Sequence, residues 1–355
     1  MEEFEMMPLR DLLEITIKQN ASDLHLTVGA VPNIRINGRL VPIGNDKLMP
    51  SDTELYSKEI LQNYYDEFLK LGEFDTSYSV SGIGRFRVNI YKQRGSCAIA
   101  LRVVGLKVPT LKELAFPSVV KELTEKQRGL VLVTGPTGSG KSTTLAAMIN
   151  EINSTRAGHI ITLEDPIEFL HKHNQSIVNQ REIGRDSLTY RNALRAILRE
   201  DPDVILVGEM RDLDTISVAL TAAETGHLVL STLHTLGAVK TIDRIVDVFP
   251  PHQQQQIKIQ LAAVLQGVIS QQLVPTVENK RAAALEVMVN TPAIQNLIRE
   301  GKTYQIESLI QTGSKHSMKT MDMSLLDLYN KGVITKESAL MYSIDKAMIT
   351  RMMNL

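Results

Sequence analysis

The chain has 355 residues, of which 43% are hydrophobic and 22% charged, and this composition predicts an ordinary globular protein with two domains. Its formal charge of −1 at pH 7 gives no general attraction to nucleic acid or to an anionic membrane, and its single cysteine, Cys97, excludes an internal disulfide and a multi-cysteine zinc site. No apolar run approaches the ~20 residues that span a bilayer, and residues 1–5 lack the basic start of a signal peptide, so we expect a cytoplasmic protein.

Residues 1–106 predict a small α+β domain. Apolar side chains recur first at helical spacing and then at alternate positions, which is typical of one helix followed by half-buried strands. The Asn37-Gly38 pair lies between two short apolar runs and predicts a β-hairpin. The other expected elements are a helix over 9–17 and strands over 24–26, 85–91 and 97–104.

Residues 107–117 contain two prolines and no regular period, and they predict a linker to a second domain over 118–355. Beyond the linker, short apolar strands alternate with amphipathic helices, which predicts an α/β domain with a parallel sheet covered on both faces. The expected strands are 130–134, 160–164, 204–207 and 228–232, and the expected helices include 188–199 and 215–224.

From residue 253 onward the pattern predicts helices, because Ile257, Leu261, Val264 and Val268 lie on one stripe. This helical C-terminal part, with its last helices from about residue 292, is expected to run to the end of the chain. Its weak amphipathicity fits packing on the second domain or on a partner.

A phosphate loop follows the first strand of the second domain. The segment GPTGSGKS lies between an apolar strand and a helix-prone stretch, the context that supports this motif. Its glycines let backbone N–H groups converge on phosphate oxygens, its lysine can reach the β- and γ-phosphates, and its serine can ligate Mg²⁺. The expected nucleotide-binding residues are Gly135, Pro136, Thr137, Gly138, Ser139, Gly140, Lys141, Ser142 and Thr143.

Carboxylates follow two of the other apolar strands. Glu164 ends the strand over 160–164 and is followed by Asp165 and Glu168, and Glu209 comes after the strand over 204–207. Sites in open α/β sheets lie at the carboxyl ends of the strands, so these groups can hold Mg²⁺ or orient water. The alternative for each is a helix cap or a solvated loop acid, and for Glu164 and Asp165 a plain Asp-Pro turn is equally favoured.

Two histidines bracket the strand over 228–232. His227 and His234 can donate a hydrogen bond to a phosphate, and the alternative for each is a structural histidine. No Cys/His cluster accompanies them, which disfavours metal ligation.

Arginines concentrate in the strands of the first domain. Arg85 and Arg87 are two residues apart and therefore share a face of the sheet, and Arg94 and Arg102 lie nearby in the sequence. Solubility is the common use of such charges. The sharper alternative is a guanidinium that reaches the γ-phosphate of a nucleotide bound by a neighbouring subunit.

Together these motifs resemble the type II/IV secretion ATPase superfamily and, within it, the PilT-like type IV pilus retraction (twitching motility) ATPases. The similarity extends over most of the chain. The matching strings are ASDLHL at 21–26, RFRVN at 85–89, GPTGSGKSTT from Gly135, LEDPIE at 163–168 (the aspartate box), REDPDVILVGEMRD at 199–212 (the Walker B region), and TAAETGHLV at 221–229 with STLH at 231–234 (the histidine box).

The resemblance implies a PAS-like N-terminal domain and a RecA-like ATPase domain. It also implies a homohexamer in which ATP is held between these two kinds of domain. It implies that Glu168 and Glu209 take the metal and water roles and that His227 and His234 line the site. Arg87 and Arg102 are the arginines that the family pattern places near nucleotide. The implied partner is an inner-membrane pilus platform protein, so the motor would work at the inner face of the membrane, with no nucleic acid.

Retraction is favoured over pilus assembly because assembly and type II secretion ATPases usually have a further N-terminal domain and often a four-cysteine zinc module. One departure concerns retraction itself: the AIRNLI string of the family is AIQNLI at 293–298, with Gln295 in place of arginine. The alternatives that remain are an assembly or accessory secretion ATPase, and a nucleotide-gated scaffold with negligible turnover. A small-molecule kinase and a nucleic-acid translocase are disfavoured.

Overall fold

The structure is a computed structural model that describes residues 6–105 and 107–353. The chain folds into two compact units. The N-terminal unit contains the residues up to 107 together with Glu168–Leu170, and the larger unit contains the rest. Residues 1–5, on which the signal-peptide expectation rests, and residue 106, the expected end of the first domain, lie outside the described residues.

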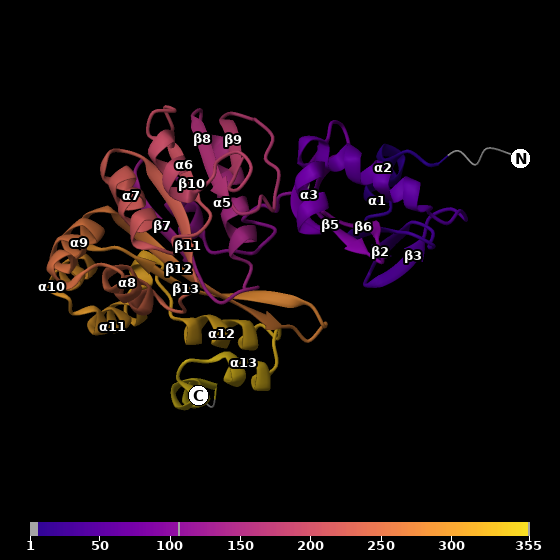
Figure 1. Ribbon diagram of the computed structural model, residues 1–355. Coiled ribbons are helices and arrows are strands. Elements are labelled where there is room, and N and C mark those ends of the chain that lie inside the picture. The colour runs from indigo at the N-terminus through magenta and orange to yellow at the C-terminus, as the bar shows by residue number, and fades with distance from the viewer. Residues whose placement is uncertain (1–5, 106, 354–355) are drawn as a thin grey trace, which may run out of the picture. The chain divides into compact units, whose positions relative to one another are not determined.

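The N-terminal unit is an α+β fold (Figure 1). Within residues 6–105, six strands form one antiparallel sheet in the order β3-β2-β1-β6-β5-β4. The elements are α1 (Leu9–Lys18), β1 (Asp23–Thr27), β2 (Asn33–Ile36), β3 (Arg39–Pro42), α2 (Pro50–Leu61), α3 (Tyr65–Leu71), β4 (Glu73–Val80), β5 (Gly84–Gln93) and β6 (Ser96–Val103).

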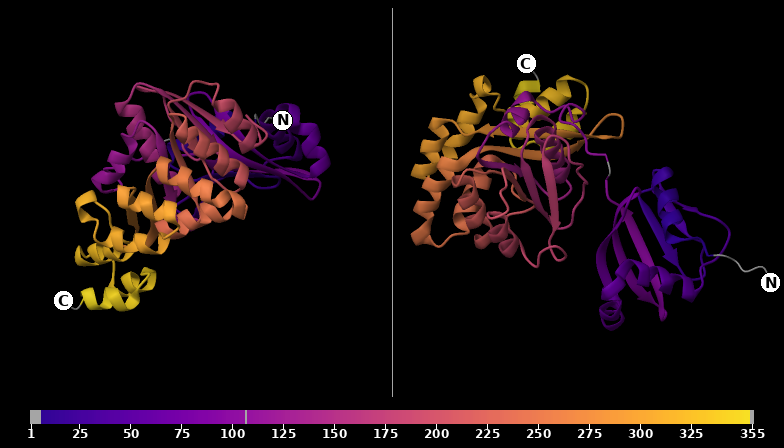
Figure 2. Two further views of the ribbon diagram at one scale, coloured as in Figure 1. Left: turned by 90° about the vertical axis from the view of Figure 1, so that its left-hand side faces the viewer. Right: turned by 90° about the horizontal axis from the view of Figure 1, so that it is seen from above.

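The two faces of this sheet differ. Phe86, Val88 and Ile90 of β5 are buried in a core shared with the three helices, which cover one face (Figure 2). Arg85, Arg87 and Asn89 alternate with these side chains and therefore lie on the opposite face. The sheet thus has one apolar face and one polar face, as the sequence predicts.

The expected hairpin is confirmed. Asn37 and Gly38 have φ angles of 49° and 81° between β2 and β3, the left-handed pair that a two-residue type I′ turn requires. Arg94 and Gly95, with φ of 51° and 81°, make the same kind of turn between β5 and β6.

The larger unit is built on a mostly parallel sheet. Within residues 107–353, seven strands have the order β13-β12-β7-β11-β10-β8-β9, and only the edge strand β13 is antiparallel to its neighbour. The elements up to α9 are α4 (Ser118–Thr124), β7 (Gly129–Thr134), α5 (Lys141–Thr155), β8 (His159–Glu164), β9 (Ile177–Glu182), α6 (Tyr190–Ile197), β10 (Val204–Val207), α7 (Leu213–Glu224), β11 (Leu228–Leu233), α8 (Ala238–Asp247) and α9 (Pro251–Val264).

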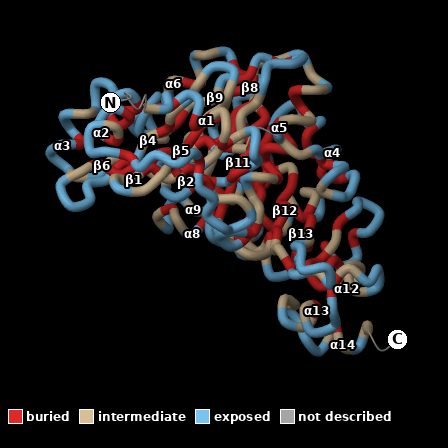
Figure 3. The backbone as a smooth tube through the Cα atoms, turned by 90° about the vertical axis from the view of Figure 1, so that its right-hand side faces the viewer, coloured by how far each residue is buried: buried red, intermediate tan, exposed pale blue. Residues whose placement is uncertain are grey.

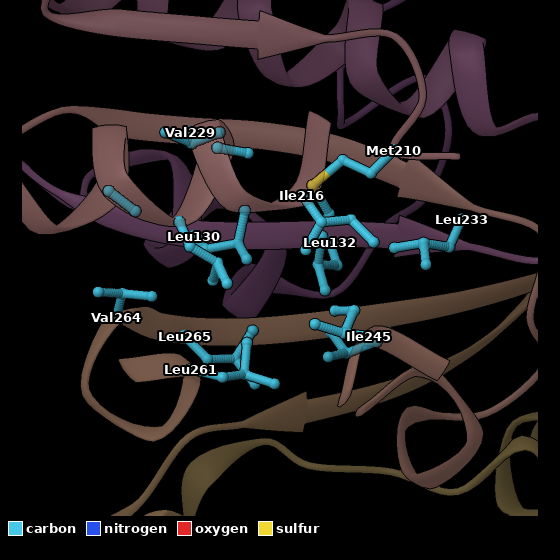
Figure 4. Packing of buried hydrophobic residues seen from close by; sticks show 14 of the residues in the cluster. Leu130, Leu132, Met210, Ile216, Val229, Leu233, Ile245, Leu261, Val264 and Leu265 are labelled. Carbon is cyan, nitrogen blue, oxygen red and sulfur yellow. The ribbon is translucent and has the colours of Figure 1, made fainter. Parts of the chain in front are cut away.

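Helices cover both faces of this sheet. Leu130 and Leu132 of β7 pack into a core with α6 to α9 (Figure 4), whereas Val131 and Val133 point to a second core with α4 and α5. The central strands are therefore buried throughout (Figure 3), which explains their almost wholly apolar sequences. Together with the N-terminal unit, this architecture confirms the predicted fold class.

The expectation that the region from residue 253 onward is helical is wrong for part of it. The helix α9 ends at Val264, and the chain continues as β12 (Leu265–Pro275) and β13 (Arg281–Val289). Val268 lies in β12, so the apolar stripe runs across the boundary between a helix and a strand. Periodicity cannot distinguish a strand buried on both faces from a buried helix, and pairing of β12 with β7 decides the outcome.

The C-terminal part from Pro292 is helical, as expected. Val274 of β12 and Ala284 of β13 share a small core with its later helices. None of the described helices is both long and apolar enough to cross a bilayer. The helices are α10 (Pro292–Glu300), α11 (Ile306–Gln311), α12 (Met321–Asn330), α13 (Lys336–Tyr342) and α14 (Lys346–Met353).

Candidate active site

The phosphate loop connects β7 to α5 at the carboxyl edge of the parallel sheet. Gly135, Gly138 and Gly140 all have positive φ, at 143°, 78° and 89°. A Cβ on Gly135 would collide with the backbone carbonyl oxygen of Gln271, so both conformation and space require glycine there. The predicted strand–loop–helix context of the motif is therefore confirmed.

The loop has the donors of an anion cradle. Lys141 Nζ donates to the carbonyl oxygens of Gly135 (2.8 Å) and Pro136 (3.0 Å), so its ammonium group lies over the loop. The hydroxyl groups of Ser139 and Thr134 are buried and have no hydrogen-bond partner among the described residues. Backbone amides at a helix N-terminus, a lysine and unpaired hydroxyl groups fit the phosphates of a nucleotide.

The remaining predicted loop residues lie at the surface of the same turn. Pro136, Thr137 and Gly138 are exposed, and Ser142 is exposed in the first turn of α5 with the half-buried Thr143 beside it in sequence.

A chain of side chains joins Glu209 to the phosphate loop. His234 Nε2 lies 3.0 Å from Glu209 Oε1, and His234 Nδ1 lies 3.4 Å from the hydroxyl oxygen of Thr137. Arg211 Nε lies 2.7 Å from the other carboxylate oxygen, Oε2, of Glu209. The Glu209 side chain is only 17% exposed, so it is held from both sides in a partly desolvated position. The structure thus brings together three of the predicted site residues, from the segments that follow β7, β10 and β11.

Tyr190 is a neighbour of this carboxylate that sequence reasoning did not assign to the site. It begins α6, and its hydroxyl group lies so close to Gly208 that a Cβ there would approach it to 2.9 Å. Burial raises the pKa of Tyr190, and the negative charges of Asp165, Glu164 and Glu209 raise the pKa further. The phenol is therefore a neutral hydrogen-bonding group beside the acidic residues.

The aspartate-box acids have different environments. Glu164 accepts hydrogen bonds from Thr162 Oγ1 (2.6 Å) and Gln180 Nε2 (3.1 Å), which fits the structural alternative. Asp165 is exposed after β8. Glu168 is exposed and belongs to the N-terminal unit, where its carbonyl oxygen accepts from the Gly105 amide at 3.2 Å. Its metal or water role stays a prediction.

The two histidines lie at opposite edges of the sheet. His234 follows β11 at the carboxyl edge, whereas His227 precedes β11, where Leu228 pairs with Gly129 at the start of β7. The His227 ring lies 2.9 Å from the carbonyl oxygen of Ala222 and thereby caps the end of α7. Within one chain the six residues of β11 therefore separate His227 from the phosphate-loop edge, and its place at a nucleotide site stays a prediction.

The predicted arginines lie side by side on the polar face of the N-terminal sheet. Arg87 and Arg102 are directly opposite each other on β5 and β6. Arg102 Nε lies 2.9 Å from Asp23 Oδ1, although its side chain is 71% exposed, and Arg87 is exposed. Arg85 instead donates to Ser77 Oγ (2.7 Å), which gives it a structural partner.

A buried amide is the second residue that sequence reasoning missed. Gln271 of β12 donates from Nε2 to the carbonyl oxygen of Ser139 (2.5 Å) and accepts at Oε1 from the Thr144 hydroxyl (2.7 Å). The sequence offers no signal for this contact, because Gln271 lies in the segment that the pattern predicts as helix.

Comparisons with known proteins point in one direction. A family model described as Type II/IV secretion system protein matches residues 97–347. The type IV pilus retraction ATPase PilT of Pseudomonas aeruginosa is 50% identical over 337 residues, which cover 94% of this chain and 97% of that protein. The twitching motility protein of Neisseria gonorrhoeae is 47% identical over 310 residues, covering 87% of this chain and 83% of that protein.

A solved structure agrees with the sequence comparisons. The crystal structure of the pilus retraction motor PilT with bound ADP matches this structure with a TM-score of 0.89 at 48% identity. The match covers 97% of this chain and 99% of the other.

Proposed function

The chain belongs to the type II/IV secretion system protein family, as its motifs predict, and we propose that it is the motor that powers retraction of type IV pili. As an ATPase of this family it hydrolyses ATP to ADP and phosphate. The observation that supports this function most directly is the contact chain from Glu209 through His234 to Thr137, because it joins a carboxylate at one strand end to the phosphate loop at another.

The roles of the loop and of the carboxylates follow from their chemistry. Lys141 is proposed to exchange its loop carbonyl partners for the β- and γ-phosphates. The Ser142 hydroxyl and the carboxylates of Glu209 and Glu168 are oxygen ligands of the kind that Mg²⁺ prefers, and Mg²⁺ when bound would neutralise the developing phosphate charge. Glu209 and Glu168 are also the candidates that orient the attacking water. His234 would connect the γ-phosphate to Glu209 through hydrogen bonds.

The sheet face that carries Arg87 and Arg102, here called the arginine face, is consistent with a role in a homohexamer. Arg87 and Arg102 present guanidinium groups on an exposed sheet face, and we propose that they reach the nucleotide bound by a neighbouring subunit of a homohexamer. In this scheme residues 1–106 form a PAS-like domain, residues 107–117 a linker and residues 118–355 the ATPase domain.

The proposed activity also implies a cellular location for the motor. We place it in the cytoplasm, at the inner face of the cytoplasmic membrane, where it would bind an inner-membrane platform protein of the pilus and no nucleic acid.

Deletion in the native host tests this function. Cells without the protein should have excess surface pili that do not retract, and twitching should return with the wild-type chain but not with Lys141→Ala. Loss of pili on deletion would instead identify an assembly motor. Unchanged pili with DNA-stimulated ATP turnover of the purified chain would identify a translocase.

A further inference from the structure

The side chain of Gln271 is held entirely by the phosphate loop and the helix that follows it. It is 2% exposed, and both ends of its amide are hydrogen bonded, Nε2 to the Ser139 carbonyl oxygen and Oε1 to the Thr144 hydroxyl. A buried amide with both polar atoms paired has one orientation, because turning it over would bring its NH₂ group to the Thr144 hydroxyl and its oxygen to the Ser139 carbonyl oxygen.

The Gln271 backbone and side chain also leave no room for a side chain at the two outer glycines of the loop. A Cβ on Gly135 would meet the Gln271 carbonyl oxygen, and a Cβ on Gly140 would come within 2.8 Å of Gln271 Nε2. Gln271 therefore touches the loop at its first glycine, at Ser139 and at its last glycine. It does so although it lies 132 residues from Ser139 in the sequence.

The contact with Ser139 orients a donor of the anion cradle. In a planar trans peptide the C=O and N–H bonds point in opposite directions. When Gln271 holds the Ser139 carbonyl oxygen against β12, the N–H group of Gly140 is turned to the other side of the loop, away from β12. A fixed N–H group of this kind binds a phosphate oxygen without a further ordering cost.

We propose that Gln271 is a positioning residue of the nucleotide site, which holds the phosphate loop in its binding conformation and thereby sets the affinity for ATP and ADP. This inference rests on the proposed function of the loop. It assigns to β12 a task in nucleotide binding besides its task in the sheet.

The next residue provides a matched control. Gln272 is also an amide of β12, but it alternates to the other face, where its Nε2 donates to the Tyr342 carbonyl oxygen at the end of α13 (3.2 Å). Gln271→Met and Gln272→Met each replace an amide with an unbranched apolar side chain of similar size in the same strand. Only the first removes a contact with the phosphate loop.

The experiment measures ADP and ATP binding to the full chain by calorimetry, together with ATPase kinetics and thermal unfolding. For Gln271→Met we expect the ADP Kd and the KM for ATP to rise about tenfold, the effect of losing two buried hydrogen bonds, whereas kcat changes less than about threefold. Gln272→Met should leave Kd and KM within about twofold of wild type. A purely structural role would lower the melting temperature and leave the Kd of the folded protein unchanged, and that result overturns the proposal.

A second variant covers the case in which Gln271→Met does not fold. Thr144→Val removes the hydroxyl donor to Gln271 Oε1 and preserves side-chain shape, and we expect a smaller rise in Kd of about threefold. An unchanged Kd in this variant counts against the proposal. If the wild-type chain itself binds neither ADP nor ATP, the proposed function fails, whereas tight wild-type binding with an unchanged Kd in Gln271→Met overturns the positioning role alone.

Discussion

The two units differ in whether their charged candidate residues have partners within the chain. In the larger unit two charged residues of the site already have partners: Lys141 is bonded to loop carbonyl oxygens, and Glu209 is shared between Arg211 and His234. On the N-terminal sheet, Arg87 lies directly opposite Arg102, and within the described residues Arg87 has no ion-pair partner.

This difference indicates different tasks. Like charges directly opposite each other destabilise a pair of strands, so a sheet face that retains them is suited to binding a negative partner. The phosphate loop of the larger unit has its own donors for an anion, among them the ammonium group of Lys141. On the polar face of the N-terminal sheet, Asp23 pairs with Arg102, whose side chain stays 71% exposed, and Arg87 is exposed beside it.

The largest expected effect is at the phosphate loop. Lys141→Ala should remove nearly all ATPase activity and leave the fold intact, because it deletes the charge that meets the β- and γ-phosphates. Phosphate release and circular dichroism measure the two properties. Lys240→Ala, which changes an exposed lysine of α8, is the control that should retain full activity. Wild-type turnover in Lys141→Ala would refute the assignment of the site.

The carboxylates should affect hydrolysis more than binding. Glu209→Gln and Glu168→Gln keep side-chain size and remove the negative charge, so each should lose more than about tenfold in kcat, equal to about 1.4 kcal/mol, with ATP affinity largely kept. Glu224→Gln, at the end of α7, is the control. Because Glu168 belongs to the N-terminal unit, a full rate in Glu168→Gln would confine the catalytic carboxylate to the larger unit.

Mixed assemblies test whether the arginine face acts on a neighbour. The Arg87→Ala/Arg102→Ala protein keeps its phosphate loop, whereas Lys141→Ala keeps its arginines. We expect each to be nearly inactive alone and activity to return partly on mixing, because some interfaces then pair an intact loop with intact arginines. The isolated domain over 118–355 should bind ATP and hydrolyse it poorly.

Two outcomes would contradict an arginine that acts between subunits. Co-assembled variants without recovered activity would exclude arginines that act between subunits, and full activity of the isolated domain would show that it needs no arginine from the N-terminal unit. Arg39→Ala, an exposed arginine of β3 in the same unit, controls for a general loss of positive charge.

The smallest effect concerns the acid stability of the larger unit. Burial lowers the pKa of His171 to about 4, below the usual value of 6.5. Between these values the unfolded chain binds a proton that the folded chain excludes, so this contribution to stability is present above pH 6.5 and is lost as the pH falls toward 4. From pH 7 to pH 5 the free energy of unfolding should fall by about 2 kcal/mol from this residue.

Urea unfolding of the wild type and of His171→Gln at both pH values measures this contribution. The variant should lose less stability than the wild type on acidification, whereas an equal loss in both proteins would assign the acid sensitivity to other groups.

Local sequence was enough to predict the parts of this protein that depend on near neighbours. The left-handed turn at Asn37-Gly38, the strand–loop–helix unit around Gly135 and the buried strand β10 were all predictable, because each rests on residues a few positions apart. The family was predictable for the same reason, since its boxes are short contiguous strings.

Tertiary structure decided what depends on distant pairing. The strands β12 and β13 replaced an expected helix because β12 pairs with β7, more than a hundred residues earlier. The direction of β11 placed His234 at the loop edge and His227 at the far edge, although the two lie only seven residues apart. Gln271 reaches Ser139 only because β12 inserts beside the loop, since a hydrogen bond requires proximity in space that no local pattern encodes.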